Sequence, residues 1–432
     1  MLPPSDPDQL PKDPVVPVPA PAPHKIVMLS AGGLATLLAG LSMLGPFSID
    51  AYLPAFPQIQ ANLHASGIEV QQTLTAYMLA FAGMVLWHGA LSDAFGRRNV
   101  ILVALVVFAI GTFGCAAAST VHYLWVFRIM QGVSAGAGVV VGRAIIRDLY
   151  SDAPAARLLS MVTMIFSIAP ALAPVMGGWI VTWFDWRAIF LALCAYTVLL
   201  GWVCWKHLPE TVPQAKRQPF NPRFLAQSYG AIFSSFLFHM KAGVTALNFA
   251  GLFLYITASP VLLPQHLGLG PSQFAWLFVP TVSGIFLGSM AANRMAGKKT
   301  FEKQILLGFA FMLGAVAFNV TYHLQYPPAL PWTVLPMFFF TFGSSIIAPG
   351  ATLLALDLFP HIRGTVASCQ SFVSTLLGAV VAGVIAPALS HSVLALALGQ
   401  VGFALLALAF WMTSRQYRRI QARNGKTRSK PQ

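Results

Sequence analysis

One carboxylate, Asp50, lies inside an apolar stretch that runs from about residue 26 to residue 59 and holds no other charge. A carboxylate at bilayer depth costs about 2.5–3.5 kcal/mol to insert, so it is usually kept because it pairs, relays protons or binds a ligand. The stretch is longer than the roughly 20 residues that a membrane span needs. The alternative is therefore that Asp50 lies at the outer mouth of the span, in contact with water.

A second charge inside an apolar stretch is Arg128, in the segment RIMQGVSAGAG. Two turns of helical rise place it about 10 Å inside the span. A guanidinium keeps its proton, so at this depth it needs an anionic or carbonyl partner. Asp50 is the nearest candidate by depth, and its protonation would release such an ion pair. The alternative is that backbone carbonyls satisfy Arg128 and that its role is structural.

The elements that position these two charges are predicted to be membrane-spanning helices. The 432 residues are 57% hydrophobic and 9% charged, with a mean hydropathy of +0.71. Repeated long apolar runs with short polar connections indicate transmembrane helices, because lipid forces backbone hydrogen bonds to close within each segment. We predict an all-α membrane protein with twelve transmembrane helices in two six-helix bundles. The predicted helices lie at about 26–57, 69–90, 100–118, 121–142, 158–182, 187–206, 242–263, 273–295, 305–323, 331–356, 365–389 and 393–413.

The net charge of +14 is distributed unevenly along the chain. Basic residues gather in alternate connections and after the last predicted helix, whereas Arg187 is the one basic residue found in the other connections. This positive-inside pattern predicts that both termini lie in the cytoplasm. The charge thus reflects membrane topology, and we expect no nucleic-acid partner.

Changes in composition divide the chain into five segments. The first is rich in proline and too polar for a secretory signal, so we expect it to be disordered. The longest polar interruption separates the predicted helices six and six. The segments are a cytoplasmic tail at 1–24, an N-terminal bundle at 25–206, a cytoplasmic linker with an interfacial lead-in at 207–238, a C-terminal bundle at 239–413 and a basic cytoplasmic tail at 414–432.

The loop GALSDAFGRR resembles the signature loop between helices 2 and 3 of the major facilitator superfamily. The match consists of Gly89, Asp93, Gly96, Arg97 and Arg98. The glycines permit a tight turn, and the Asp can accept charge from basic groups or a helix N-terminus. The resemblance implies that the loop stabilises the outward-facing state. The alternative is a basic inner loop with an incidental carboxylate.

This loop has a partial counterpart in the second half, MAANRMAGKK. Aligning Gly96 with Gly297 pairs two arginines with two lysines, but it pairs Asp93 with Arg294. Six helices plus six with corresponding inner loops indicate parallel repeats about an axis along the membrane normal, as in the major facilitator halves.

Two helices carry further resemblances to this superfamily. Arg128, Gln131 and Gly132 match the helix 4 signature of proton-driven members. In helix 5, APALAPVMGG resembles the signature associated with antiporters, although Ala173 stands where that signature has Gly. Its two prolines should also bend the helix. The matching positions, with the additional first proline, are Pro170, Pro174, Gly177 and Gly178.

Four short motifs together resemble the Bcr/CflA-type drug:proton antiporters, the bicyclomycin and chloramphenicol resistance branch. They are SIDAYLPAFP at 48–57, LPET at 208–211, LYITASP at 254–260 and FPHIRGTVAS at 359–368. The resemblance covers about residues 30–412. It implies a multidrug efflux transporter of the bacterial inner membrane that exchanges drugs for protons by alternating access. Some relatives carry a second helix 1 carboxylate two turns earlier, where this chain has Ser42.

The expected substrate is a small amphipathic drug, bound between the halves by apolar and aromatic walls. Aromatic residues in spans also serve as packing or interface anchors. The candidates for the cavity wall are Tyr52, Tyr77, Phe81, Phe166, Tyr255 and Trp276.

Three other functions compete with this one. A proton-coupled uptake symporter for a small metabolite would use the same fold. A membrane-embedded enzyme needs clustered His, Asp or Glu, but the ten histidines are scattered without metal spacing. A channel needs rings of charge or a carbonyl filter, which no span offers. We expect a monomer in the bilayer, no enzyme activity, no metal and no cofactor beyond the proton gradient. We also expect no use of ATP, because the sequence has no phosphate-binding loop of the Gly-x4-Gly-Lys-Ser/Thr kind. The four cysteines are expected to be buried thiols.

Overall fold

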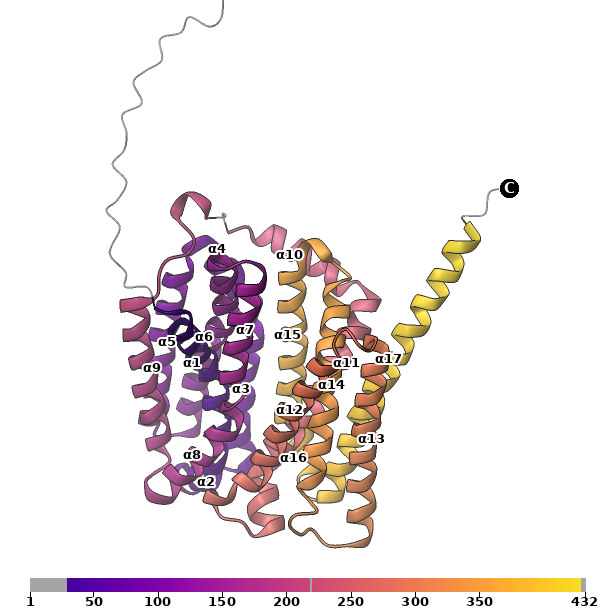
Figure 1. Ribbon diagram of the computed structural model, residues 1–432. Coiled ribbons are helices and arrows are strands. Elements are labelled where there is room, and N and C mark those ends of the chain that lie inside the picture. Colours follow the sequence, from indigo (N-terminus) through magenta and orange to yellow (C-terminus); the bar gives the residue numbers. More distant parts are fainter. Residues whose placement is uncertain (1–28, 218–219, 429–432) are drawn as a thin grey trace, which may run out of the picture.

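The computed structural model describes residues 29–217 and 220–428, which form two helical bundles lying side by side (Figure 1). No strand occurs in these ranges. The first bundle contains α1 (Ala31–Asp50), α2 (Phe56–Leu63), α3 (Gly67–Val85), α4 (His88–Phe95), α5 (Arg97–Ala117), α6 (Val121–Leu149), α7 (Asp152–Phe166), α8 (Ala169–Trp183) and α9 (Arg187–His207). After α10 (Pro222–Phe233), the second contains α11 (Phe236–Val261), α12 (Ala275–Met295), α13 (Phe301–Gln325), α14 (Leu335–Leu356), α15 (Arg363–Val380), α16 (Ala386–Leu389) and α17 (Val393–Arg428).

The described residues contain eleven segments that are long and apolar enough to cross a membrane. A twelfth span results when α3 and α4, which meet at a bend of 51°, are counted as one. The prediction of twelve transmembrane helices is therefore confirmed. The first 24 residues, for which we predicted disorder, lie outside the described ranges. Beyond residue 413, where the last predicted span ends, α17 continues as helix to Arg428.

Several helices begin at a polar capping residue that accepts a hydrogen bond from a free backbone N–H. Ser66 and Glu69 form a reciprocal capping box at the start of α3. Thr120 and Thr300 cap α6 and α13 in the simpler way. Large apolar side chains are exposed on the outer faces, among them Trp183 at 80% exposure, as expected where lipid replaces water.

Prolines lie next to the interruptions of the first and fifth spans. The first span breaks after Asp50 into a short 3-10 turn, η1 (Leu53–Ala55), and then α2. The fifth span is interrupted at Ser167 and Ile168, just before Ala169 and Pro170. Its two parts together form one span at Arg157–Trp183, and the bend expected from the two prolines stays a prediction.

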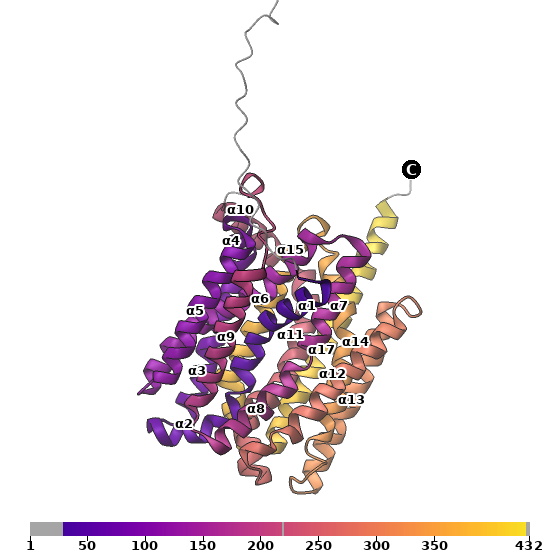
Figure 2. The same ribbon diagram turned by 60° about the vertical axis from the view of Figure 1, so that its left-hand side comes forward.

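The two ends of the molecule can be told apart by the short helices that lie there. Both views place α4 and α10 at one end, here called the α10 end, and α2 at the other, the α2 end (Figures 1 and 2). At the α2 end the two bundles are in contact, because α8 packs against α12 and against η4 (Pro271–Gln273). Gln71 also donates to the Thr257 carbonyl at 3.2 Å, and Gln72 donates to the Gly383 carbonyl at 2.9 Å.

The connecting helix α10 touches both bundles at the α10 end. It packs against α11 and α15 of the second bundle. The hydroxyl of Tyr229 donates to the carbonyl of Leu86, at the bend between α3 and α4 of the first bundle. Burial raises the pKa of Tyr229 to about 12, so the hydroxyl keeps its proton as a donor at neutral pH.

Candidate functional site

Arg128 lies in the interior of the first bundle with no exposed surface. Its Nη1 donates to the Ser48 carbonyl at 2.9 Å and to Gln131 Oε1 at 2.8 Å. The guanidinium carbon also lies 4.9 Å from the ring centroid of Tyr52 and 4.5 Å from that of Tyr77. Both rings therefore stabilise the cation through their electron-rich faces. Nε and Nη2 of Arg128 have no hydrogen-bond partner among the described residues.

Gln131 and Gly132 fix the position of Arg128. Three residues along α6, Gln131 lies beside Arg128 on the same helix face, and it donates through Nε2 to Thr112 of α5 at 2.8 Å. A Cβ at Gly132 would overlap the carbonyl of Tyr77, so only glycine allows α6 to approach α3 this closely. The spacing Arg, Gln, Gly thus places one charge at the junction of α1, α3, α5 and α6.

Asp50 is the last residue of α1 and is 5% exposed. It is thus enclosed by protein rather than open to solvent. The ion pair suggested by the sequence is not formed in this structure: among the described residues, no salt bridge joins Asp50 to Arg128. The Arg instead reaches the carbonyl of Ser48, two residues before Asp50 on α1. The carbonyl alternative therefore describes this state, and the two charges are linked through the last turn of α1.

The glycine pair of α8 contacts two different neighbours. A Cβ at Gly177 would overlap the carbonyl of Ala51, next to Asp50. A Cβ at Gly178 would overlap the carbonyl of Pro271 in the second bundle. Pro170 is the second residue of α8, and Pro174 lies inside the helix. The helix 5 motif therefore joins the end of α1 to the contact between the bundles.

The loop between α4 and α5 is held by ion pairs within the first bundle. Gly96 has φ +96°, a backbone conformation that side chains rarely adopt. Arg97 pairs with Asp93 at 2.5 Å and with Asp148 of α6 at 3.1 Å. Arg98 donates to the Trp205 carbonyl of α9.

Two acidic residues in this network were not identified from the sequence as site residues. Glu210 accepts the backbone N–H of Arg97 at 2.9 Å and so caps α5 from a distant segment. Asp148 accepts from Thr211 at 2.7 Å as well as from Arg97. Glu210 and Thr211 belong to the LPET motif, which was recognised only by resemblance. Its contact with the loop is long-range, so the local pattern gave no sign of it.

The six predicted cavity residues lie in four different places. Tyr52 and Tyr77 are buried against Arg128, and the Tyr77 ring lies 6.2 Å from that of Phe81. Phe166 ends α7 at the interruption of the fifth span and is half-buried. The structure does not bring Trp276 to this group, because it lies on α12 with 47% exposure.

The sixth aromatic residue, Tyr255, belongs to a neutral polar group in the second bundle. Asn319 of α13 donates to the Tyr255 hydroxyl at 2.6 Å. Asn248 of α11 is 3% exposed, and neither of its amide atoms has a partner among the described residues. The two asparagines were missed because single amides in an apolar run carry no spacing signal.

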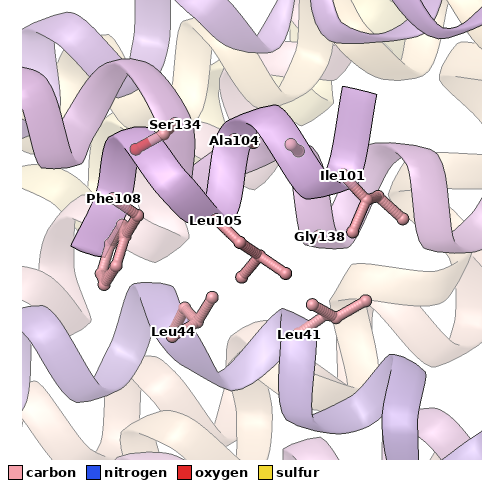
Figure 3. Close-up of a pocket in the computed structure, with 9 residues that line it drawn as sticks. Leu41, Leu44, Ile101, Ala104, Leu105, Phe108, Ser134 and Gly138 are labelled. Carbon is pink, nitrogen blue, oxygen red and sulfur yellow. The ribbon is translucent and has the colours of Figure 1, made fainter. Parts of the chain in front are cut away.

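A small hollow lies inside the first bundle between α1, α5 and α6 (Figure 3). Figure 3 shows Leu41 and Leu44 facing Leu105 and Phe108 across it. Its volume is about 10 Å³, near the least that holds one water molecule. It is too small for a drug. No group of metal-ligating side chains occurs in the described ranges.

The fold and these charges define a polytopic membrane transporter built from two bundles. The sequence pattern of the Major Facilitator Superfamily matches residues 36–383, and the chain belongs to this family. It is 30% identical over 351 residues to the bicyclomycin resistance protein homolog of Haemophilus influenzae, covering 80% of this chain and 87% of that one. It is 29% identical over 342 residues to multidrug resistance protein D of Escherichia coli, with coverages of 77% and 83%.

Solved structures support the same fold. A nucleoside transporter matches with a TM-score of 0.69 and 13% identity, covering 89% of this chain and all of the other. A D-xylose-proton symporter matches with a TM-score of 0.65 and 18% identity, covering 88% of this chain and 98% of the other. The resemblance to the major facilitator superfamily and to its resistance proteins is thus confirmed.

Proposed function

We propose that this protein exports small amphipathic drugs in exchange for protons by alternating access. The observation that carries the proposal is the buried Arg128, close to the turn that bears Asp50. Two of its guanidinium nitrogens have no hydrogen-bond partner within residues 29–217 and 220–428. A buried cation attracts an anion into its surroundings. A deprotonated Asp50 would draw toward Arg128, and a protonated Asp50 would not. The names of the two curated relatives support a drug as the transported substrate.

The proposed orientation places the α10 end in the cytoplasm of a bacterium and the α2 end outside the inner membrane. The basic loops at 97–98 and 298–303 support it through the positive-inside rule. In this orientation the bundles are closed toward the outside, where Gly178 of α8 contacts Pro271. We therefore propose that this is an inward-facing state, and that the transporter works as a monomer without an organic cofactor.

The loop at Gly96 fits this state. Asp93 pairs with Arg97 of its own bundle rather than with a partner in the second bundle. In the outward-facing state, we propose that Asp93 exchanges this partner for the N-terminus of α15, whose backbone N–H groups attract a carboxylate. The cavity for the drug would lie between the Arg128 group and the neutral Tyr255 group.

The test compares Asp50→Asn with the wild type in cells and in inverted membrane vesicles. The substitution keeps the shape of the side chain but removes its charge, so drug resistance and drug-driven proton release should both fall to the level of cells without the transporter. Asp185→Asn removes an exposed carboxylate near the α2 end, where Asp185 pairs with Arg187 at 3.4 Å, and is the matched control. Unchanged resistance in Asp50→Asn would refute the proposed proton site.

The direction of transport is tested separately. Wild-type inverted vesicles with an imposed acid interior should accumulate drug if the protein is an exporter. Efflux of preloaded substrate under the same gradient would instead identify the uptake symporter.

A further inference from the structure

A row of side chains along α3 lies against the second bundle near the α2 end. The row consists of Gln71, Gln72, Thr75 and Met78, whose spacing places them along one side of the helix. On this side α3 packs against α15 and against a π-helical turn that follows it, η6 (Val381–Ile385). None of these four residues was predicted from the sequence as a site residue.

The two glutamines donate to backbone carbonyls in two different segments of the second bundle. Gln71 is 8% exposed and donates through Nε2 to the Thr257 carbonyl of α11 at 3.2 Å. Gln72 donates through Nε2 to the Gly383 carbonyl of η6 at 2.9 Å. Both distances are normal for N–H···O hydrogen bonds. Two adjacent residues of α3 thus bind the first bundle to α11 and to the segment after α15.

Both acceptors lie where the backbone of their span is irregular. Gly383 is the middle residue of η6, and π-helical turns of this kind interrupt the regular hydrogen-bond pattern of a helix. Thr257 lies three residues before Pro260, which has no N–H to donate. Irregular backbone inside a span is tolerated where neighbouring groups supply hydrogen bonds to it. Here the glutamines supply these bonds from the opposite bundle.

Close packing holds α3 at the distance that these bonds need. A Cβ at Gly383 would lie 2.9 Å from Thr75, and a Cβ at Gly378 would lie 2.7 Å from Met78. Side chains at these two positions would therefore push α3 away from α15. No salt bridge joins the bundles at the α2 end in the ranges 29–217 and 220–428. The polar part of the closure described here is thus made of neutral groups.

We propose that Gln71 and Gln72 form an uncharged lock that holds the α2 end closed. Moving α3 away from α11 and η6 breaks both hydrogen bonds, so the lock sets how often this end is open. Neither partner is ionic, and added salt should not weaken the lock. That the lock opens in each transport cycle rests on the alternating access proposed above, whereas its holding role does not.

The experiment measures the opening of the α2 end by pulsed electron paramagnetic resonance. Spin labels are attached at Asn62→Cys in α2 and Gln325→Cys at the end of α13, both exposed, in full-length protein without native cysteines. Gln71→Leu should raise the ratio of open to closed molecules about fivefold, because one hydrogen bond is lost. A double variant that also carries Gln72→Leu should shift the ratio further.

Gln71→Glu separates the hydrogen bond from the space that the side chain fills. At pH 8 an ionised carboxylate cannot donate to the Thr257 carbonyl, so the α2 end should open as in Gln71→Leu. At pH 5 a protonated carboxyl can donate again, and the distances should return toward those of the wild type at the same pH. Gln265→Glu places the same group at an exposed position of η3 (Leu262–His266) and is the matched control.

The proposal is supported if the lock variants lengthen the distance at the α2 end while Gln265→Glu does not. Unchanged distances in Gln71→Leu and in the double variant would overturn it. Melting temperatures measured in parallel identify a variant that has lost its fold. A second label pair, Asn99→Cys and Lys298→Cys, reports the α10 end from exposed positions. If the α2 end opens and this second pair does not approach, the lock is supported and alternating access fails.

Discussion

The two bundles share a fold but differ in the chemistry of their interiors. Within the spans of the first, Asp50 and Arg128 are buried and ionisable. At a comparable place the second has neutral groups, the Tyr255–Asn319 hydrogen bond and the amide of Asn248, which has no partner in the part of the chain that the structure describes. The described part of the second bundle buries Lys241 too, but toward the α10 end. Under the proposed function, proton exchange would belong to the first bundle, and the second would offer hydrogen bonds to an uncharged part of the substrate.

The corresponding loops of the two bundles share a backbone turn but differ in the side chains around it. Gly96 and Gly297, aligned from the sequence alone, both have positive φ, +96° and +74°. A Cβ at Gly96 would meet Glu210 and Arg217, whereas one at Gly297 would meet nothing within 4 Å. The backbone turn is repeated, while the ionic network around it occurs in the first bundle.

The largest effect is expected from Arg128. Arg128→Met leaves the Ser48 carbonyl and Gln131 Oε1 without their donor, which destabilises the fold by about 2–3 kcal/mol. It also removes the cation that would attract Asp50, so drug resistance should disappear. Arg128→Lys keeps a charge but loses the planar geometry, and should retain partial activity. The measurements are growth on drug and thermal unfolding, and full resistance in the Met variant would contradict the assignment.

The next effect concerns the contact between the bundles. Gly178→Val places a side chain against the Pro271 carbonyl and costs about 1–3 kcal/mol of overpacking in the closed state. The α2 end should then open more often. A cysteine at Thr257, which is 1% exposed, would react faster with an impermeant maleimide from outside, in a background without the native cysteines.

Gly201→Val is the control for this variant, because a Cβ there meets nothing within 4 Å. Equal labelling in the two variants would mean that Gly178 does not hold the α2 end closed.

The two loop glycines should differ in stability when each is replaced by Ala. Gly96→Ala forces a side chain into a backbone region that is nearly exclusive to glycine and crowds Glu210, so the loss should be about 2–3 kcal/mol. Gly297→Ala meets open space and should lose only about 1 kcal/mol. Melting temperatures in detergent measure both. Equal losses of stability in the two variants would show that the ionic network around Gly96 does not increase the cost of replacing this glycine.

The smallest effect is expected in the neutral group of the second bundle. Asn319→Ala removes the donor to the Tyr255 hydroxyl, worth about 1 kcal/mol. The apparent KM for drug should rise roughly fivefold, with the number of protons released per drug unchanged. Asn293→Ala, at an exposed position of α12, is the control. A change in proton release by Asn319→Ala would contradict the assignment of proton exchange to the first bundle alone.

The sequence predicted the fold well, because apolar length fixes where a span lies. Arg128, which we expected within a span from the helical rise, is buried in the interior of the first bundle. Depth along the membrane normal does not fix direction around a helix axis, however. For this reason an Asp50–Arg128 ion pair was suggested, whereas the structure shows Arg128 bonded to the Ser48 carbonyl.

Long-range packing accounts for most of what the sequence could not predict. Glu210 accepts a hydrogen bond from the backbone N–H of Arg97, although the two residues are 113 positions apart. Only the folded chain brings them together. Trp276 was predicted to line the cavity, but it is exposed on α12. The sequence of a span does not show whether an aromatic residue faces a cavity or the lipid. The helix 5 glycines were recognised as a motif from the sequence. Their contacts with Ala51 and Pro271 could not be predicted from it.

Those two neighbours limit how α8 can move. Successive residues on a helix are about 100° apart around its axis, so Gly177 and Gly178 face the Ala51 and Pro271 carbonyls from adjacent sides. A rotation of α8 that separates one glycine from its carbonyl also changes the contact of the other glycine with the second carbonyl. A rearrangement at the end of α1 would therefore be transmitted to the opposite bundle through a single peptide unit, without a relay of side chains.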